Sequence, residues 1–116
     1  MLQINRVIET VLYVDDLARA SEFYRDTLQV GLMGESDTFC AFAVGDSSVL
    51  LLFERGASLR TRHLPGGEIP PHDGQGPLHV CFAIDAERLD AWEEHLDRLA
   101  VPIEGRMQWP RGGTSL

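Results

Sequence analysis

The feature that most constrains the fold is an internal repeat. Glu9 and His79 lie 70 residues apart, and Leu28-Gln29-Val30 matches Leu99-Ala100-Val101 at an offset of 71 residues. A long-period repeat fixes the architecture before any single element does, because each copy is one supersecondary unit. The chain is therefore expected to contain two copies of one plan, joined by a connection that accounts for the one-residue slip.

The first copy predicts a strand, a helix and three further strands. Ile8–Val14 is rich in β-branched and aromatic side chains, which is typical of a strand. Asp15 and Asp16 follow it, and either can cap a helix. Apolar residues then recur on one helical face, at Leu17, Ala20, Tyr24 and Leu28. Three strands are expected after the helix, with a tight turn at Gly45-Asp46 before the last: 31–34, 38–44 and 48–54.

The second copy begins the same plan again. Leu78–Ile84 has the composition of a strand, Asp85 can cap a helix, and Pro102 marks the exit from that helix. The helix carries an apolar stripe at Leu89, Trp92, Leu96 and Leu99. Weaker strand candidates follow at 102–109 and 113–116. The counterpart of the strand 48–54 would fall beyond residue 116, so the last strand of the second copy is expected to be absent. An exposed sheet edge, or one filled by another molecule, would result.

These patterns predict one α+β domain of 116 residues. Its expected parts are a first module at 5–56, a connecting loop at 57–76 and a C-terminally incomplete second module at 77–116. Two copies can cover one face of each sheet with a helix and leave the other faces to line a shared concave surface. The connection is rich in Gly and Pro, and both a functional loop and a flexible join are compatible with it.

Charge and hydropathy exclude several classes of function. The chain has 18 acidic and 10 basic residues, for a net charge of −8, and no basic run that would neutralise nucleic-acid phosphates. The longest purely apolar run, Val49 to Phe53, is far too short to span a bilayer. The N-terminus lacks the layout of a signal peptide, so a cytoplasmic protein is expected. Cys40 and Cys81 lie in strand-like segments and are interpreted as buried, reduced thiols.

Strand alternation brings candidate metal ligands to the concave face. In the second copy Val80, Phe82 and Ile84 form an apolar set suited to packing under the helix, which leaves His79 on the opposite face. By repeat equivalence Glu9 faces the same cavity, and Glu54 is a third candidate. A carboxylate and an imidazole that converge from different strands can bind a divalent ion such as Zn, Mn, Fe, Co or Ni.

Structural roles remain open for each of these residues. His79 is equally compatible with a structural histidine, Glu9 with a solvated acid at a strand end, and Glu54, next to Arg55, with an exposed strand terminus. His63 and His72 lie in the connecting loop and are expected to be exposed.

Three stretches resemble the vicinal oxygen chelate superfamily, which includes glyoxalase I, bleomycin-resistance proteins, fosfomycin-resistance enzymes and extradiol dioxygenases. Glu9–Leu17 and Ala20–Leu28 resemble the opening module of the superfamily. Ile69–Ile84 resembles the opening of its second module, and Gly112–Leu116 resembles the run just before its closing segment. The resemblance implies two βαβββ modules whose mixed sheet forms a cup around a metal, with ligands from the first and last strands of each module.

The same resemblance assigns residues to roles. His79 matches the second-module histidine, Glu9 stands where many members carry histidine, and Glu54 lies near the ligand of the first module's last strand. The family's terminal glutamate would belong to the absent strand. Gln29 replaces a glycine that is common after the helix.

The resulting hypothesis is a divalent-metal-dependent enzyme that acts on a small substrate with vicinal oxygens, as a lyase, isomerase or dioxygenase. Glu9 or Glu54 is the candidate to shuttle a proton, and the resemblance implies a homodimer. Two alternatives stay open. One is a metal-free protein that sequesters a small molecule in the manner of the bleomycin-resistance group. The other is an interaction domain whose cup is filled with side chains.

Overall fold

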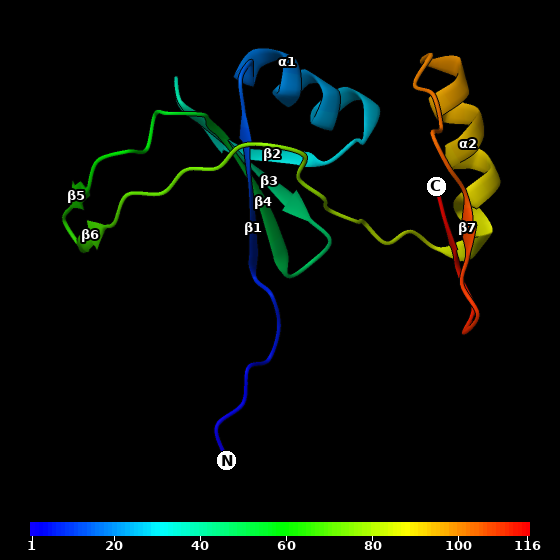
Figure 1. Cartoon of the computed structure of the whole chain (residues 1–116), viewed down its shortest axis with the longest axis horizontal. Helices are drawn as coiled ribbons and strands as arrows, with labels where there is room; N and C mark the ends of the chain where they lie inside the picture. The colour runs from blue at the N-terminus through cyan, green and yellow to red at the C-terminus, as the bar shows by residue number, and fades with distance from the viewer. The chain divides into compact units, whose positions relative to one another are not determined.

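The computed structural model describes residues 1–116 as two compact units, Met1–Leu78 and His79–Leu116. The first unit contains a strand–helix–three-strand succession followed by a small hairpin, and the second contains one main helix and two short strands (Figure 1). None of the helices has both the length and the apolar character needed to cross a membrane.

The first unit is built on a four-stranded mixed sheet. Its strands are β1 (Glu9–Val14), β2 (Gly31–Glu35), β3 (Phe39–Val44) and β4 (Ser48–Glu54), in the spatial order β1-β4-β3-β2. β1 runs parallel to β4, while β3 is antiparallel to both β4 and β2. The only strand beside β1 is therefore β4. The expected strands agree closely with these bounds, and the turn at 45–47 places Gly45 at a φ of +61°.

The helix of the first unit starts at a side-chain cap and changes type before it ends. The Asp16 carboxylate accepts a hydrogen bond of 3.1 Å from the Arg19 N–H at the start of α1 (Leu17–Glu22), which satisfies one of the free donors of the first turn. The chain continues as a π-helix, η1 (Phe23–Thr27). The wider turn was not expected from the 3.6-residue spacing of the apolar stripe.

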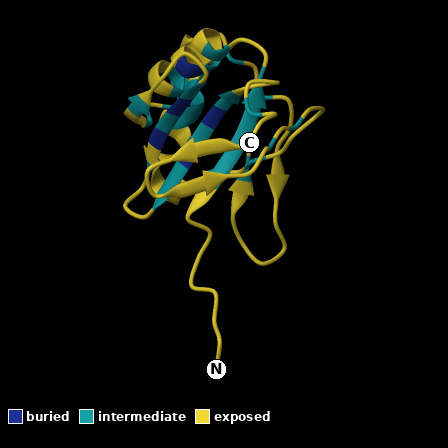
Figure 2. Cartoon of the chain, turned by 90° about the vertical axis from the view of Figure 1, so that its left-hand side faces the viewer, coloured by how far each residue is buried: buried dark blue, intermediate teal, exposed yellow.

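The core of the first unit lies between the helix and one face of the sheet. The fully buried apolar side chains come from β3 and β4, and their pairing places them on the same face: Cys40, Phe42, Leu50 and Leu52. Tyr24 of η1 packs against Phe42 at 6.2 Å between ring centroids, so the helix covers this face (Figure 2). Burial of each large side chain contributes about 1.5–3 kcal/mol. Every buried residue of the chain belongs to this unit.

The connection after β4 contains a hairpin that the sequence patterns did not predict. β5 (Arg62–Leu64) pairs with β6 (Gly67–Ile69) across the two-residue turn Pro65-Gly66, a composition that favours a tight reversal. His63 Nδ1 lies 3.0 Å from Glu68 Oε1, and both side chains are exposed. The expected exposure of His63 is confirmed.

The second unit forms its helix but not its expected first strand. A short 3₁₀ turn, η2 (Ala86–Arg88), leads into α2 (Leu89–Arg98), and β7 (Met107–Gln108) pairs with β8 (Thr114–Ser115). Leu78–Ile84 joins no ladder. In the first unit the equivalent strand β1 is held only by β4, and no strand equivalent to β4 occurs within 79–116. A strand without a hydrogen-bonding neighbour has nothing to fix its backbone.

The two cysteines differ in burial, and both are free thiols. Cys40 is buried in β3, as expected. Cys81 is exposed, so its predicted burial is wrong. The segment Leu78–Ile84 joins no ladder, and the Cys81 thiol is left exposed there.

The repeat is visible in the backbone at both helix ends. Gln29 and Ala100 both have a φ of +57°, in the left-handed region that usually selects glycine. Each is followed by a closing hydrogen bond to the helix, from Val30 N–H to Tyr24 O at 3.2 Å and from Val101 N–H to Leu96 O at 2.9 Å. Gln29 thus adopts the glycine-like turn expected at this point.

Replacing Gln29 with glycine is expected to stabilise the protein. The left-handed conformation costs a residue with a side chain about 1–2 kcal/mol, and glycine avoids this cost. The greater freedom of glycine in the unfolded chain offsets part of the resulting gain in stability. Gln29→Gly should therefore raise the free energy of unfolding by about 0.5–1 kcal/mol, measured by urea denaturation. Ala18→Gly, at an exposed position inside α1, is the control and should lower it by about 1 kcal/mol. A lower stability for Gln29→Gly would contradict the assignment.

Candidate functional site

The sheet of the first unit has one face under the helix and one face without a helix. Residues opposite each other in the β1–β4 ladder point to the same side, and successive residues alternate. The pairs Glu9–Val49, Val11–Leu51 and Tyr13–Phe53 therefore share the face opposite to the buried Leu50 and Leu52. We call the face formed by these three pairs the open face. None of its side chains is fully buried.

Glu9 stands at the start of β1 on the open face, and its side chain is exposed. The structure shows no hydrogen bond or ion pair for its carboxylate, which leaves both oxygens available to a ligand. Its neighbours on β4 that share the face are Val49, Leu51 and Phe53. Because none of them has a donor atom, β4 supplies no second metal ligand beside Glu9.

The ladder separates Glu54 from Glu9. Glu54 is paired with Val14, at the opposite end of β1 from Glu9, and five residues of strand correspond to about 16 Å. Alternation also places Glu54 on the side of Leu50 and Leu52 rather than on the open face. The β1–β4 register therefore does not bring Glu54 next to Glu9, and Glu54 is an exposed carboxylate at a strand terminus. A role for Glu54 as a metal ligand stays a prediction.

His79 is the first residue of the second unit and is exposed. Its ring has no hydrogen-bond partner in the structure, so both nitrogens are accessible to a ligand. The structure contains no group of three or more His, Cys, Asp and Glu side chains arranged to hold a metal ion. The convergence of Glu9 with His79 stays a prediction from the repeat.

A histidine that was expected to be exposed packs on the first sheet. His72 Nδ1 lies 2.8 Å from the Tyr13 hydroxyl, and the His72 ring meets Phe53 edge-on at 4.7 Å between centroids. Its backbone N–H donates to the Ser58 carbonyl at 2.9 Å. Phe39 stacks on the other side of the group, 5.6 Å from Phe53. We call Tyr13, Phe39, Phe53 and His72 the aromatic cluster. The expected exposure of His72 is wrong, because these contacts half-bury it.

The aromatic cluster contains one hydrogen bond, which joins the Tyr13 hydroxyl and His72 Nδ1 at 2.8 Å. Burial raises the pKa of the Tyr13 phenol, and the Asp73 carboxylate raises it further. The tautomer of His72 decides which of the two groups donates, and in both tautomers Nε2 is the ring nitrogen without a partner in the protein. Strand alternation places Tyr13 on the face of Glu9, but no local pattern pairs it with a residue 59 positions away.

The two residues after His72 hold the connection against the first sheet. The Asp73 side chain accepts a hydrogen bond of 3.0 Å from the Gly56 N–H. Gly74 lies so close to the Tyr13 ring that a Cβ at this position would come within 2.6 Å of Tyr13 Cδ2. The segment 72–74 is therefore part of the first unit rather than a free linker.

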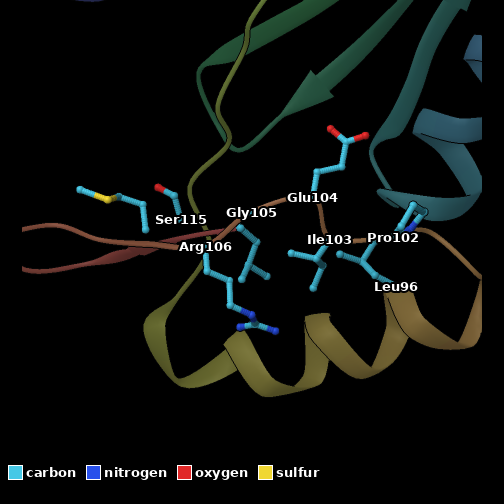
Figure 3. Close-up of a pocket in the computed structure, with 9 residues that line it drawn as sticks. Leu96, Pro102, Ile103, Glu104, Gly105, Arg106 and Ser115 are labelled. Carbon is cyan, nitrogen blue, oxygen red and sulfur yellow. The ribbon is translucent and has the colours of Figure 1, made fainter.

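The second unit contains a separate hollow of about 570 Å³ between α2 and the segment that follows it. Its lining is mostly apolar and includes Leu96, Ile103 and Met107. Arg106 reaches from the hollow toward α2 (Figure 3) and makes a two-point hydrogen bond with the Glu93 carboxylate, at 2.6 and 2.8 Å. This contact lowers the pKa of Glu93. No predicted site residue lines the hollow.

Comparison with known proteins gives a consistent family assignment. The model of the Glyoxalase/Bleomycin resistance protein/Dioxygenase superfamily matches residues 3–112. A lactoylglutathione lyase from Agrobacterium tumefaciens is 33% identical, with a TM-score of 0.83 over 97% of this chain and 83% of that one. A glyoxalase/bleomycin resistance protein/dioxygenase from Nocardioides is 17% identical, with a TM-score of 0.64 over 95% and 72%. No curated protein matches.

These likenesses confirm the predicted fold class. The mixed four-stranded sheet and the two helices match the fold of the solved structures. A protein from the mobile metagenome of V. Pseudocholerae, 18% identical with a TM-score of 0.71 over 97% of this chain and 82% of that one, shares the fold.

Adding a side chain at Gly74 is expected to displace the connection from the first sheet. Gly74→Ala places a methyl group against the Tyr13 ring, and overpacking of this kind costs about 1–3 kcal/mol. The free energy of unfolding should fall by this amount, and amide exchange at 72–74 should accelerate. Gly66→Ala in the same connection is the control, because nothing lies within 4 Å of its Cβ position. Equal stability of the two variants would show that Gly74 is not packed on Tyr13.

Proposed function

Because the chain belongs to the glyoxalase/bleomycin resistance protein/dioxygenase superfamily, we propose that it is a divalent-metal-dependent enzyme acting on a small substrate with two neighbouring oxygens. The observation that carries the proposal is the unpaired carboxylate of Glu9 on the open face, with His79 at the equivalent position of the second repeat. The likeness to a lactoylglutathione lyase supports a lyase or isomerase reaction; a dioxygenase reaction is the other class within the proposal.

Glu9 and His79 provide oxygen and nitrogen donors, a set that fits Zn, Mn, Fe, Co or Ni. They are one fewer than the three protein ligands typical of a catalytic zinc site. A bound divalent ion supplies Lewis-acid stabilisation of negative charge that develops on the substrate oxygens.

The chain's own residues would perform the remaining tasks. Glu9, the carboxylate on the open face, would accept or return a proton. The apolar side chains beside it, Val49 and Leu51, would limit the access of water to that proton. We further propose that the protein acts as a homodimer, as the family resemblance implies.

The metal proposal is tested by two ligand variants and two matched controls. Glu9→Gln and His79→Ala should each weaken the affinity for the metal ion at least tenfold, because each removes one of two donors. The affinity is measured by titration with Zn²⁺ or Mn²⁺. Glu54→Gln and His63→Ala should bind as the wild type does, since Glu54 lies at the far end of the ladder and His63 pairs with Glu68. Unchanged binding by both ligand variants, with circular dichroism showing a folded chain, would refute the site.

One observation favours a second candidate, a metal-free protein that sequesters a small molecule. The β4 side chains that share the open face with Glu9 are all apolar, and an apolar surface with few polar groups is typical of a binding pocket. Under this alternative Glu9 is a polar contact and not a metal ligand.

Chelation separates the two candidates. With 4-nitrocatechol as a probe that carries two neighbouring oxygens, the enzyme proposal predicts at least tenfold weaker binding after EDTA treatment, measured by absorbance titration, and recovery on adding back Zn²⁺ or Mn²⁺. Binding that is equal before and after EDTA would instead support sequestration. Binding of 4-nitrocatechol to Glu9→Gln should be measured in parallel, since this variant is expected to lose only the metal-dependent part of the binding.

A further inference from the structure

The open face divides into an acidic end and an aromatic end. Glu9 is its only charged side chain. Tyr13 and Phe53 lie four residues further along the two strands, which corresponds to about 13 Å. Phe39 and His72 join them there, with ring centroids 5.6 Å and 4.7 Å from Phe53. The span between the two ends is longer than one aromatic ring.

The aromatic end also offers one hydrogen-bonding group. The Tyr13 hydroxyl occupies His72 Nδ1, so Nε2 is the ring nitrogen that is left for a ligand. Nε2 has no hydrogen-bond partner in the protein, yet the structure contains no buried side-chain nitrogen or oxygen without a partner. His72 Nε2 is therefore reachable from solvent. A polar ring nitrogen at the rim of an aromatic surface is suited to a hydrogen bond with a ligand hydroxyl.

We propose that the open face of the first unit binds an uncharged aromatic ring, which packs on Phe53 and Phe39 while His72 Nε2 makes a hydrogen bond with a hydroxyl group of the ligand. The inference deepens the proposed function, and rests on it, in taking this molecule as the substrate: an elongated compound with an aryl group at the aromatic end and vicinal oxygens near Glu9. Aromatic rings favour offset or edge contacts with other rings, which gives them an advantage over aliphatic groups of equal size.

The charge of the face argues against an anionic substrate such as a glutathione conjugate. Carboxylates are held in proteins by cations, above all by Arg, and none of the six open-face residues is basic. Arg55 directly follows β4, but its guanidinium is already paired with Asp15 at 2.8 Å. A carboxylate on this face would meet no arginine, and it would meet the like charge of Glu9.

The experiment uses full-length, EDTA-treated protein, so that it does not depend on any metal. Binding of 2-naphthol, naphthalene and the saturated analogue decahydro-2-naphthol is measured by ¹H–¹⁵N NMR titration. We expect 2-naphthol to bind at least fivefold more tightly than decahydro-2-naphthol, with shift changes at 13, 53 and 72. Phe53→Leu, which keeps an apolar side chain but removes the ring, should weaken 2-naphthol binding by about threefold to tenfold.

His72→Phe tests the hydrogen bond separately. It keeps a ring against Phe53 and removes Nε2, so the preference for 2-naphthol over naphthalene, expected to be about threefold to tenfold from one hydrogen bond, should disappear. Phe23→Leu is the matched control, because Phe23 belongs to the helix that covers the other face. It should bind all three probes as the wild type does.

Three outcomes would overturn the inference. One is equal binding of the aromatic and the saturated probe. Another is an equal loss of affinity in Phe23→Leu and Phe53→Leu. The third is a change of oligomeric state in Phe53→Leu, measured by sedimentation, which would make a second copy of the chain the occupant of the face. None of these results affects the metal titration of Glu9→Gln, so the two proposals fail independently.

Discussion

The parallel pairing of β1 with β4 is the constraint on which the first unit depends. It places Glu9 beside Val49 and Val14 beside Glu54, and so decides which side chains share a face. The same ladder directs Leu50 and Leu52 into the core under the helix and turns Tyr13 and Phe53 the other way. A shift of β1 by one residue would turn Glu9 and Tyr13 to the helix side of the sheet.

Local signals were sufficient for most of the first unit. Asp16 caps its helix, Gly45 forms its turn, and β4 has the expected bounds, because each is specified by residues close in sequence. Long-range pairing was not predictable in this way. The Tyr13–His72 contact joins residues 59 positions apart. Leu78–Ile84 has the composition of a strand, but composition cannot provide the neighbour that a strand requires.

The candidate site was likewise predictable only in part from the sequence. Glu9 was assigned to the concave face by its equivalence to His79 in the repeat, where Val80, Phe82 and Ile84 form one apolar face and leave His79 on the other. Val49–Phe53 is continuously apolar, as in strands covered on both sides, and so gives no parity for Glu54. Only the observed register puts Glu54 on the helix side. In this register Glu9 is the one carboxylate that the β1–β4 ladder places on the open face.

The two proposed ligands also differ in how well the protein prepares them. Glu9 is held in place by β4, whose ladder fixes the backbone of β1 before any ligand arrives. His79 lies in a segment that joins no ladder within its unit. Fixing one residue's backbone costs about 1–2 kcal/mol. An ion bound through His79 would therefore bind more weakly, because part of its binding energy would be used to order this segment. A strand paired with Leu78–Ile84 would remove this cost, as β4 does for β1, and metal affinity would then be coupled to completion of the second sheet.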